Sequence, residues 1–116
     1  QKYYKTGDFT VLKNVGMKKG DNILYINVMN NLSIDCDCDS NPHDPEMKDI
    51  GILASTDPVA LDQACLDLVY AVKPTEGNDN RPLVNRIESL HGRHTVDYAE
   101  TIGLGSKNYE LVVLDT

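Results

Sequence analysis

The sequence has 116 residues, of which 41% are apolar, and it contains one Phe and no Trp. A chain of this length fits a single domain, whose core is then built from Leu, Ile, Val, Ala and Tyr, as suits an α/β protein. The formal net charge of -7 disfavours binding to nucleic acids and anionic membranes, because both would repel the average surface. No apolar run approaches the roughly 18 residues of a membrane span and no signal peptide is visible, so we expect a cytoplasmic location.

The first half of the chain predicts a short helix within residues 1–22 and then two strands, at about residues 23–30 and from Ile50 to Ala54. The first strand is apolar on both faces, which is typical of the buried interior of a helix-covered sheet. A loop of about ten residues joins the two strands, which is short for a parallel crossover between neighbours, so an antiparallel or a non-adjacent pair remains open.

A helix with clear start signals follows the second strand. Asp57 can accept hydrogen bonds from the free amides of the first turn, and Pro58 fits the first helical position. The apolar residues of this helix form a stripe at helical spacing: Leu61, Cys65, Leu68 and Val72. A cysteine in that setting packs in the core, so Cys65 is left out of the candidate site.

Two further helices and a last strand complete the chain. One helix spans about residues 81–90 with Gly92 as a stop, and the other begins at a cap on Thr95 and ends at Gly103. The stretch YELVVLD gives the strand. The order strand, strand, helix, helix, helix, strand predicts an α/β fold, a small helix-covered sheet of about three or more strands, to which a partner or a further part of the protein can add.

The stretch IDCDCDSNPHDPE, residues 34–46, concentrates the side chains that bear chemistry. Cys36, Cys38 and His43 are three ligands that could hold zinc or iron at the end of the first strand. The two cysteines have α-carbons about 6.6 Å apart in an extended chain and side chains aimed alike, so a disulfide is not expected. The flanking aspartates disfavour the thiolate, so without a metal these cysteines are poor nucleophiles.

Two other interpretations of the same stretch remain open. Its oxygen ligands match the spacing of a calcium-binding loop over residues 35–46, although Ser40 replaces the turn glycine and Pro42 opposes the loop. The positions concerned are Asp35, Asp37, Asp39, Asn41, His43 and Glu46. Alternatively, the stretch is an acidic surface loop whose aspartates face water and whose cysteines are small buried apolar residues.

Two further polar segments allow a functional or a structural interpretation. His91 and His94 bracket the glycine between two helices and could approach a metal from a second segment, or could simply interact with a helix C-terminus. Ser55, Thr56 and the free amides of the following helix could hold an anion. The structural alternative is that Asp57 caps that helix.

The relative direction of the two strands decides whether these candidates form one site. Ligands of open α/β sheets collect beyond the carboxyl ends of the strands. If the first two strands run parallel, Asp35, Asp37 and Asp57 lie at the same edge. A separate hypothesis is that the chain is an enzyme or a fragment of one, in which Asp57, Asp62 and a histidine act as acid–base groups at the strand ends.

Three segments carry a resemblance to a known family: LYINVMNNLSIDCDCDS, DIGILASTDPVALDQACLDLV and YAETIGLGSKNYEL. They resemble the C-terminal part of the uncharacterised iron-sulfur-centre proteins known as domain of unknown function 362, over roughly residues 22–114. The resemblance implies that residues 1–116 are one domain of a longer protein. It also implies that the parent holds an iron-sulfur cluster on an upstream ferredoxin-like segment with C-x-x-C-x-x-C-x-x-x-C spacing, a motif that is absent from this sequence. The positions that match the family, without an assigned role, are Asp35, Cys36, Asp37, Cys38, Asp57, Pro58 and Asp62.

The leading hypothesis is a non-catalytic, metal-associated or scaffolding domain of a cytoplasmic iron-sulfur protein. Cys36 and Cys38 are the expected zinc or iron ligands, with His43 as a third ligand and Asp57 at the same edge. The expected partners are the N-terminal and ferredoxin-like parts of the parent, or a second copy in a homodimer. The enzyme fragment and the calcium-binding loop over residues 35–46 are the alternatives.

Overall fold

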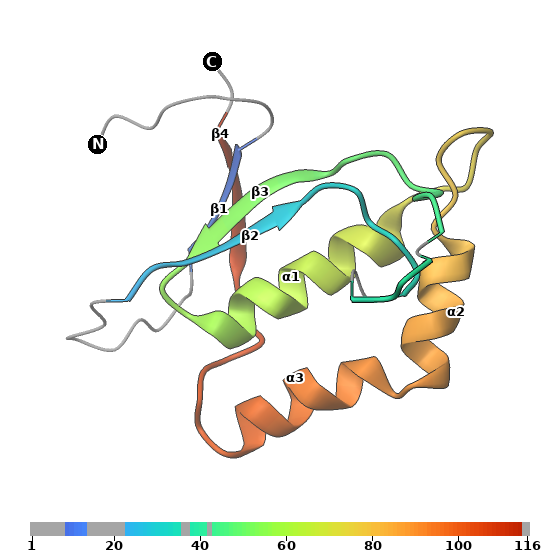
Figure 1. The fold of residues 1–116 in the computed structure, drawn as a ribbon. Coiled ribbons are helices and arrows are strands. Elements are labelled where there is room, and N and C mark those ends of the chain that lie inside the picture. Colours follow the sequence, from blue (N-terminus) through green and yellow to red (C-terminus); the bar gives the residue numbers. More distant parts are fainter. Residues whose placement is uncertain (1–8, 14–22, 36–37, 42, 115–116) are drawn as a thin grey trace.

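The computed structural model of the chain describes residues 9–13, 23–35, 38–41 and 43–114. Within these residues, four strands and three helices follow one another: β1 (Phe9–Lys13), β2 (Tyr25–Met29), β3 (Gly51–Ser55), α1 (Pro58–Ala71), α2 (Arg81–Ser89), α3 (Gly92–Thr101) and β4 (Glu110–Leu114). The strands form one sheet in the order β2-β3-β1-β4, and α1 runs along one of its faces (Figure 1). This is an α/β fold, as predicted, with the predicted succession of elements preceded by one more strand.

The sheet is mixed. β2 pairs with β3 in the antiparallel direction, with Ile26 opposite Ala54 and Val28 opposite Ile52. β1 lies between β3, to which it is parallel, and β4, to which it is antiparallel. The central pair of the sheet is therefore β3 and β1, and β2 and β4 are its outer strands in the described part of the chain.

β1 corrects the prediction of a short helix in the opening segment. Phe9–Lys13 is extended and pairs on both sides, with β3 and with β4. The segment FTVLK is rich in aromatic and β-branched residues, which favour strands, but five residues are too few for periodicity to separate a strand from a helix. Pairing on both sides decides the outcome. The remainder of the predicted helix, residues 1–8 and 14–22, lies outside the described residues.

α1 begins where the sequence predicts. Asp57 Oδ1 accepts hydrogen bonds from the amides of Val59, at 2.8 Å, and Ala60, at 3.1 Å, and Pro58 occupies the first turn. The buried face of α1 packs on the sheet in one apolar cluster: Met29, Met47, Leu53, Leu61, Ala64 and Val69. Burying a side chain of Leu or Met size stabilises the fold by about 1.5–3 kcal/mol, so this face holds α1 in place.

The junction of α2 and α3 differs from the prediction. The chain turns at His91, whose φ of 52° is left-handed, and α3 begins at Gly92 rather than after a cap on Thr95. Gly92 permits this close junction, because a Cβ atom there would lie 3.0 Å from Ile87 Cγ2. At the other end, the prediction for Gly103 is confirmed: with a φ of 82° it follows the last turn of α3.

The helices are tied to one another and to β4 by side-chain hydrogen bonds. Asn80, which is buried, donates from Nδ2 to the Val69 carbonyl at 2.8 Å and so fixes the end of α1. The Tyr109 hydroxyl donates to Asp67 on α1 just before β4 begins. Burial, as the larger cause, and this hydrogen bond together raise the pKa of Tyr109 to about 12. α3 runs alongside α1, and α2 joins them at one end (Figure 1).

β2, the strand predicted at about residues 23–30, is not buried on both faces, contrary to the prediction. Met29 is buried and Tyr25 and Asn27 are half-buried toward α1, but Ile26 and Val28 are 55% and 61% exposed. α1 covers one face of the sheet, and β2 is an outer strand of the described sheet. Apolar residues on both faces of a strand therefore did not indicate an interior position here.

Candidate functional site

The acidic loop, which we define as residues 34–46, is held at its base by contacts with three parts of the fold. Asp35 forms an ion pair with Arg86 of α2 at 3.2 Å. At the returning end, the Glu46 carbonyl accepts a hydrogen bond from the amide of Asp79 at 2.9 Å, and Met47 is buried in the apolar cluster. The Ile50 amide then donates to the Met29 carbonyl at 2.9 Å, which closes the loop onto the β2–β3 pair.

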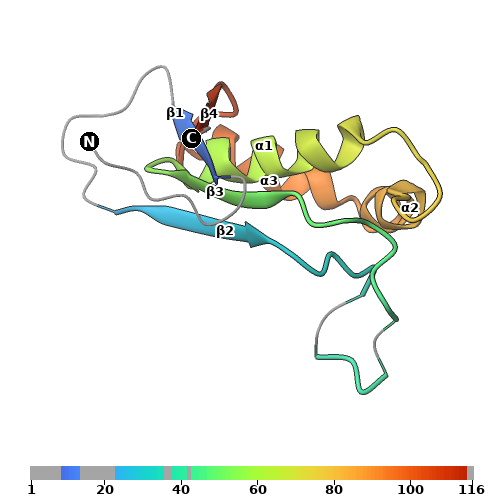
Figure 2. The ribbon, with the colours of Figure 1, turned by 90° about the horizontal axis from the view of Figure 1, so that it is seen from above.

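The tip of the acidic loop projects away from the body of the protein (Figure 2). Cys38, Asp39 and His43 are exposed there, and the Asp39 carboxylate accepts a hydrogen bond from the Asn41 amide at 3.1 Å. Such a hydrogen bond, from a backbone amide two residues on, shapes a local turn. The tip thus displays a sulfur atom, an imidazole and carboxylates to solvent, on a base that is pinned to the fold.

The described residues do not by themselves complete a metal site. Cys38 takes part in a disulfide bond, contrary to the prediction from the C-x-C spacing, and a disulfide sulfur is not a thiolate ligand. Among the residues that the structure describes, no group of three or more His, Cys, Asp or Glu side chains is placed to hold a metal ion. Cys36 and Asp37 lie outside those residues. The ligand set of Cys36, Cys38 and His43 and the calcium loop over residues 35–46 both stay predictions.

The common edge expected for Asp35, Asp37 and Asp57 is not formed by β2 and β3. These strands are antiparallel, so the acidic loop after β2 and the turn after β3 lie at opposite ends of the strand pair. The open alternative, an antiparallel pair joined by a short loop, is the correct one. Asp57 therefore does not border the acidic loop.

Asp57 is a buried anchor, with 7% of its surface exposed. Besides the two amides at the start of α1, its Oδ2 atom accepts a hydrogen bond from the amide of Ser106 at 2.9 Å. Its own amide donates to the Ser55 hydroxyl at 3.0 Å. The structural interpretation of the ASTDP segment is confirmed, because Asp57 itself occupies the amides that an anion would use. These bonds make Asp57 a poor candidate for an acid–base group.

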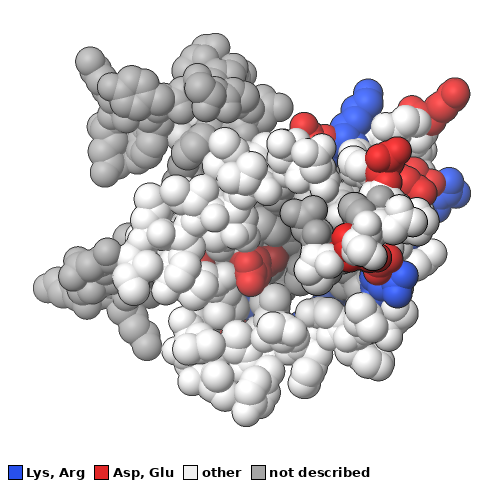
Figure 3. Space-filling view, in the orientation of Figure 1, with Lys and Arg blue, Asp and Glu red and all other residues white. Residues whose placement is uncertain are grey.

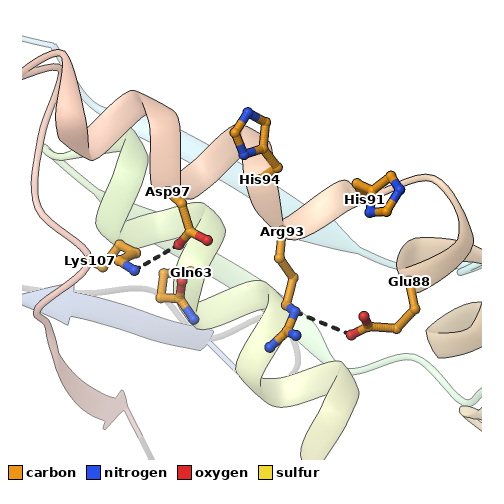
Figure 4. A pocket seen from close by; sticks show the side chains of 7 residues that line it. All are labelled: Gln63, Glu88, His91, Arg93, His94, Asp97 and Lys107. Carbon is orange, nitrogen blue, oxygen red and sulfur yellow. Dashed lines mark hydrogen bonds and ion pairs between the residues drawn. The ribbon is translucent and has the colours of Figure 1, made fainter.

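His91 and His94 line an open polar groove of about 400 Å³ beside α3, together with Gln63, Glu88, Arg93, Asp97 and Lys107. Each cation of the groove has an acidic partner: Arg93 pairs with Glu88 at 3.2 Å and Lys107 with Asp97 at 2.7 Å (Figure 4). The hydrogen bond from Lys107 lowers the pKa of Asp97.

The two imidazole rings lie apart from each other in the polar groove (Figure 4). They do not converge on one point in the groove, and the approach of these histidines to a metal from a second segment stays a prediction. The charges of the groove are also balanced within it, since both cations are engaged by carboxylates. We therefore assign no ligand to the polar groove.

A second cavity, which we name the Asp62 cavity, lies between β2, α1 and α3 and has a volume of about 360 Å³. It is lined by the apolar residues Met29, Leu66, Val69 and Val96, by Gly92, and by three residues with polar side chains, Asp62, Cys65 and Thr95. This mixture of an apolar wall and a few polar groups is typical of small-molecule sites.

Asn27 organises the polar side of the Asp62 cavity. Its Nδ2 atom donates to Asp62 Oδ1 at 3.1 Å and lies at hydrogen-bond distance, 3.4 Å, from Cys65 Sγ. Burial raises the pKa of Cys65; the hydrogen bond from Asn27 lowers it and the charge of Asp62 raises it again. The helical spacing of Cys65 predicts core packing, and it does not reveal this cluster. The signal was Asn27 itself, an amide in the apolar run ILYINVM that needs a polar partner on the helix it faces.

A mixed four-stranded sheet with helices packed on one face defines this part of the chain as a small α/β domain. The family model described as "Domain of unknown function (DUF362)" matches residues 9–67, half of the chain, and the chain belongs to this family. The match includes the acidic loop, Asp57 and Asp62, and it ends within α1. No curated protein and no solved structure is detectably similar to the chain. None of the helices in the described residues is long and apolar enough to cross a membrane.

Proposed function

We propose that this chain is a non-catalytic scaffolding domain of a larger cytoplasmic iron-sulfur protein, which it completes by docking through β2. The observation that carries the proposal is the apolar surface at this strand: Ile23, Leu24, Ile26 and Val28 are each between 55% and 61% exposed. Outer strands of stable monomers are commonly protected by charges or by prolines. The segment from Ile23 to Met29 has neither, and an apolar patch of this kind marks an interaction site.

The distribution of charge supports docking at β2. Figure 3 shows that the surface over β2 consists of uncharged atoms, whereas Lys, Arg, Asp and Glu side chains gather over α2 and the loops beside it. In the described residues, β2 pairs along one edge, with β3, so its second edge can accept a strand by main-chain hydrogen bonding. The partner we propose is the ferredoxin-like part of the parent protein.

The docking proposal is tested by coexpressing the chain with the ferredoxin-like part of its parent and measuring their affinity. The double substitution Ile26→Lys and Val28→Lys should weaken association at least about tenfold, because two charges would be desolvated in an apolar interface. A matched control is Leu104→Lys, at a residue that is 62% exposed but lies after α3. Equal affinities for the wild type and the double variant would contradict the proposal. Loss of a homodimer, seen by sedimentation, would assign β2 to self-association instead.

A second candidate function, metal association at the acidic loop, is favoured by the way the loop is anchored. The ion pair of Asp35 and the buried Met47 fix both ends of the loop, which reduces the entropy lost when ligands at its tip converge. We infer that reduction in the cytoplasm would open the disulfide of Cys38. Cys36, Cys38 and His43 would then supply the ligands for zinc or iron. The iron-sulfur cluster of the parent protein is not part of this proposal for the acidic loop.

The metal proposal is tested by elemental analysis of protein purified in a thiol reductant without added metal. About one equivalent of zinc or iron is expected, lost on Cys36→Ser and on Cys38→Ser, because two of three protein ligands are thiolates. The variant Cys65→Ser serves as the control and should retain the metal, since Cys65 lies on α1, away from the loop. Metal contents below about a tenth of an equivalent, unchanged by Cys36→Ser, would contradict metal binding.

A further inference from the structure

The Asp62 cavity has a feature that the proposed scaffolding role does not use. Its wall is formed by side chains that are nearly fully buried, among them Met29, Val69 and Val96, each with 4–5% of its surface exposed. Asp62 lies at the exposed side of the same cavity. A carboxylate therefore borders a space whose inner surface is apolar, which is the arrangement expected for a ligand with one charged end and one apolar end.

The charge of Asp62 is not balanced by the described residues. Four other carboxylates of the described chain each form an ion pair: Asp35, Asp79, Glu88 and Asp97. Asp62 accepts a hydrogen bond from the neutral Asn27 amide and has no ion pair among the residues that the structure describes. The hydrogen bond from Asn27 holds the Asp62 carboxylate in place. The negative charge of Asp62 stays available to a cation.

The cavity is better suited to an organic cation than to a metal ion. A metal would need several charged or imidazole ligands, and no group of three or more His, Cys, Asp or Glu side chains in the described part of the chain is placed to supply them. An ammonium group needs one carboxylate and further hydrogen-bond acceptors. Thr95 lines the same cavity, and a threonine hydroxyl can supply one.

We propose that the Asp62 cavity binds a small primary amine, whose ammonium group pairs with Asp62 and whose apolar body lies against Leu66, Val69 and Val96. The volume of about 360 Å³ lies at the lower end of the range for ligand sites, roughly 300–1,000 Å³. Alkylamines are protonated at neutral pH, as the lysine side chain is, and the net charge of -7 attracts cations to the protein. Figure 3 shows an acidic patch within the uncharged surface between β2 and α3, in agreement with a negatively charged opening in an apolar setting.

The test titrates the whole chain with n-hexylammonium chloride and compares it with n-hexanol and sodium hexanoate, by isothermal titration calorimetry. Saturable binding of the amine is expected, at least about tenfold tighter than that of the alcohol and with no detectable binding of the carboxylate. The variant Asp62→Asn, which keeps the shape and removes the charge, should weaken amine binding by at least the same factor. Glu110→Gln makes the same change in net charge at an exposed position outside the cavity and should leave the affinity for the amine unchanged.

Cys65 provides a second readout that depends on the location of the ligand. In a Cys36→Ser, Cys38→Ser background, bound hexylammonium should slow the reaction of Cys65 with N-ethylmaleimide, because Cys65 is one of the residues that line the cavity. Protection that is lost in Asp62→Asn, with an unchanged thermal unfolding curve, would support the site. Amine binding that is no tighter than hexanol binding, or that Asp62→Asn leaves intact, would overturn it. Neither result bears on docking through β2, so the two proposals fail independently.

Discussion

The substitution Asp57→Ala is expected to lower the free energy of unfolding by about 2–4 kcal/mol, without a direct effect on any ligand site. Removing the carboxylate leaves the amides of Val59 and Ala60 without their cap and the Ser106 amide without its acceptor. A helix cap is worth about 0.5–2 kcal/mol, and a hydrogen bond to a charged group about 1.5–3 kcal/mol. Urea denaturation of the wild type and the variant measures the difference.

Gly105 gives this prediction an internal check. A Cβ atom at Gly105 would overlap the Asp57 carboxyl, at 2.6 Å from its Cγ atom, so Gly105→Ala should destabilise by about 2 kcal/mol or more. Because the clash is with the carboxyl itself, the double variant Asp57→Ala, Gly105→Ala should lose less stability than the sum of the single variants. Gly77→Ala, at a φ of 80° with open space around it, is the control for backbone strain alone. Additive losses would mean that the carboxyl and Gly105 are not in contact.

The substitutions Leu53→Ala and Val28→Ala should differ strongly in effect, although both remove apolar atoms from neighbouring strands. Leu53 is fully buried under α1 and Val28 is 61% exposed. Truncating a buried leucine costs about 2–5 kcal/mol, because it removes apolar contacts and leaves a cavity. An exposed side chain typically contributes less than about 0.5 kcal/mol. Denaturation of the isolated chain measures both.

The comparison of Leu53 with Val28 also reports on docking. If the isolated chain loses as much stability from Val28→Ala as from Leu53→Ala, the second face of the sheet is already covered, and the docking proposal loses its surface. Assembled with the partner, Val28→Ala should become more costly, because docking would bury this side chain. Leu53→Met, which conserves volume, serves as the control for the core and should cost less than about 1.5 kcal/mol.

The elements that the sequence predicts well are those with local start and stop signals. Asp57 and Pro58 place the start of α1, and Gly103 places the end of α3, because capping depends on a few neighbouring residues. The prediction fails where the deciding contacts lie far away in the chain. β1 is a strand because β3 and β4 pair with it, and Ile26 and Val28 are exposed because of the strand order.

The candidate sites divide in the same way. The acidic loop could be found from its composition, since its residues are consecutive. The Asp62 cavity could not, because Asn27 meets Asp62 and Cys65 only after the β2–β3 pair has been covered by α1. Likewise, the sequence left the strand directions open, and the antiparallel pairing then separated Asp57 from the acidic loop. The chemical character of each residue could be predicted from the sequence, but the residues that surround it in the fold could not.

The position of β1 in the sheet has a consequence for how the protein is made. β1 pairs with residues 52–54 on one side and with residues 110–114 on the other. Both partner segments are therefore synthesised after β1 itself. Contacts between segments so distant in sequence slow folding, because the entropy of closing long loops is lost before the new contacts stabilise the fold. While α1, α2 and α3 are being synthesised, the edge of β1 that pairs with β4 has no partner strand, and unpaired strand edges make incompletely folded chains prone to aggregation.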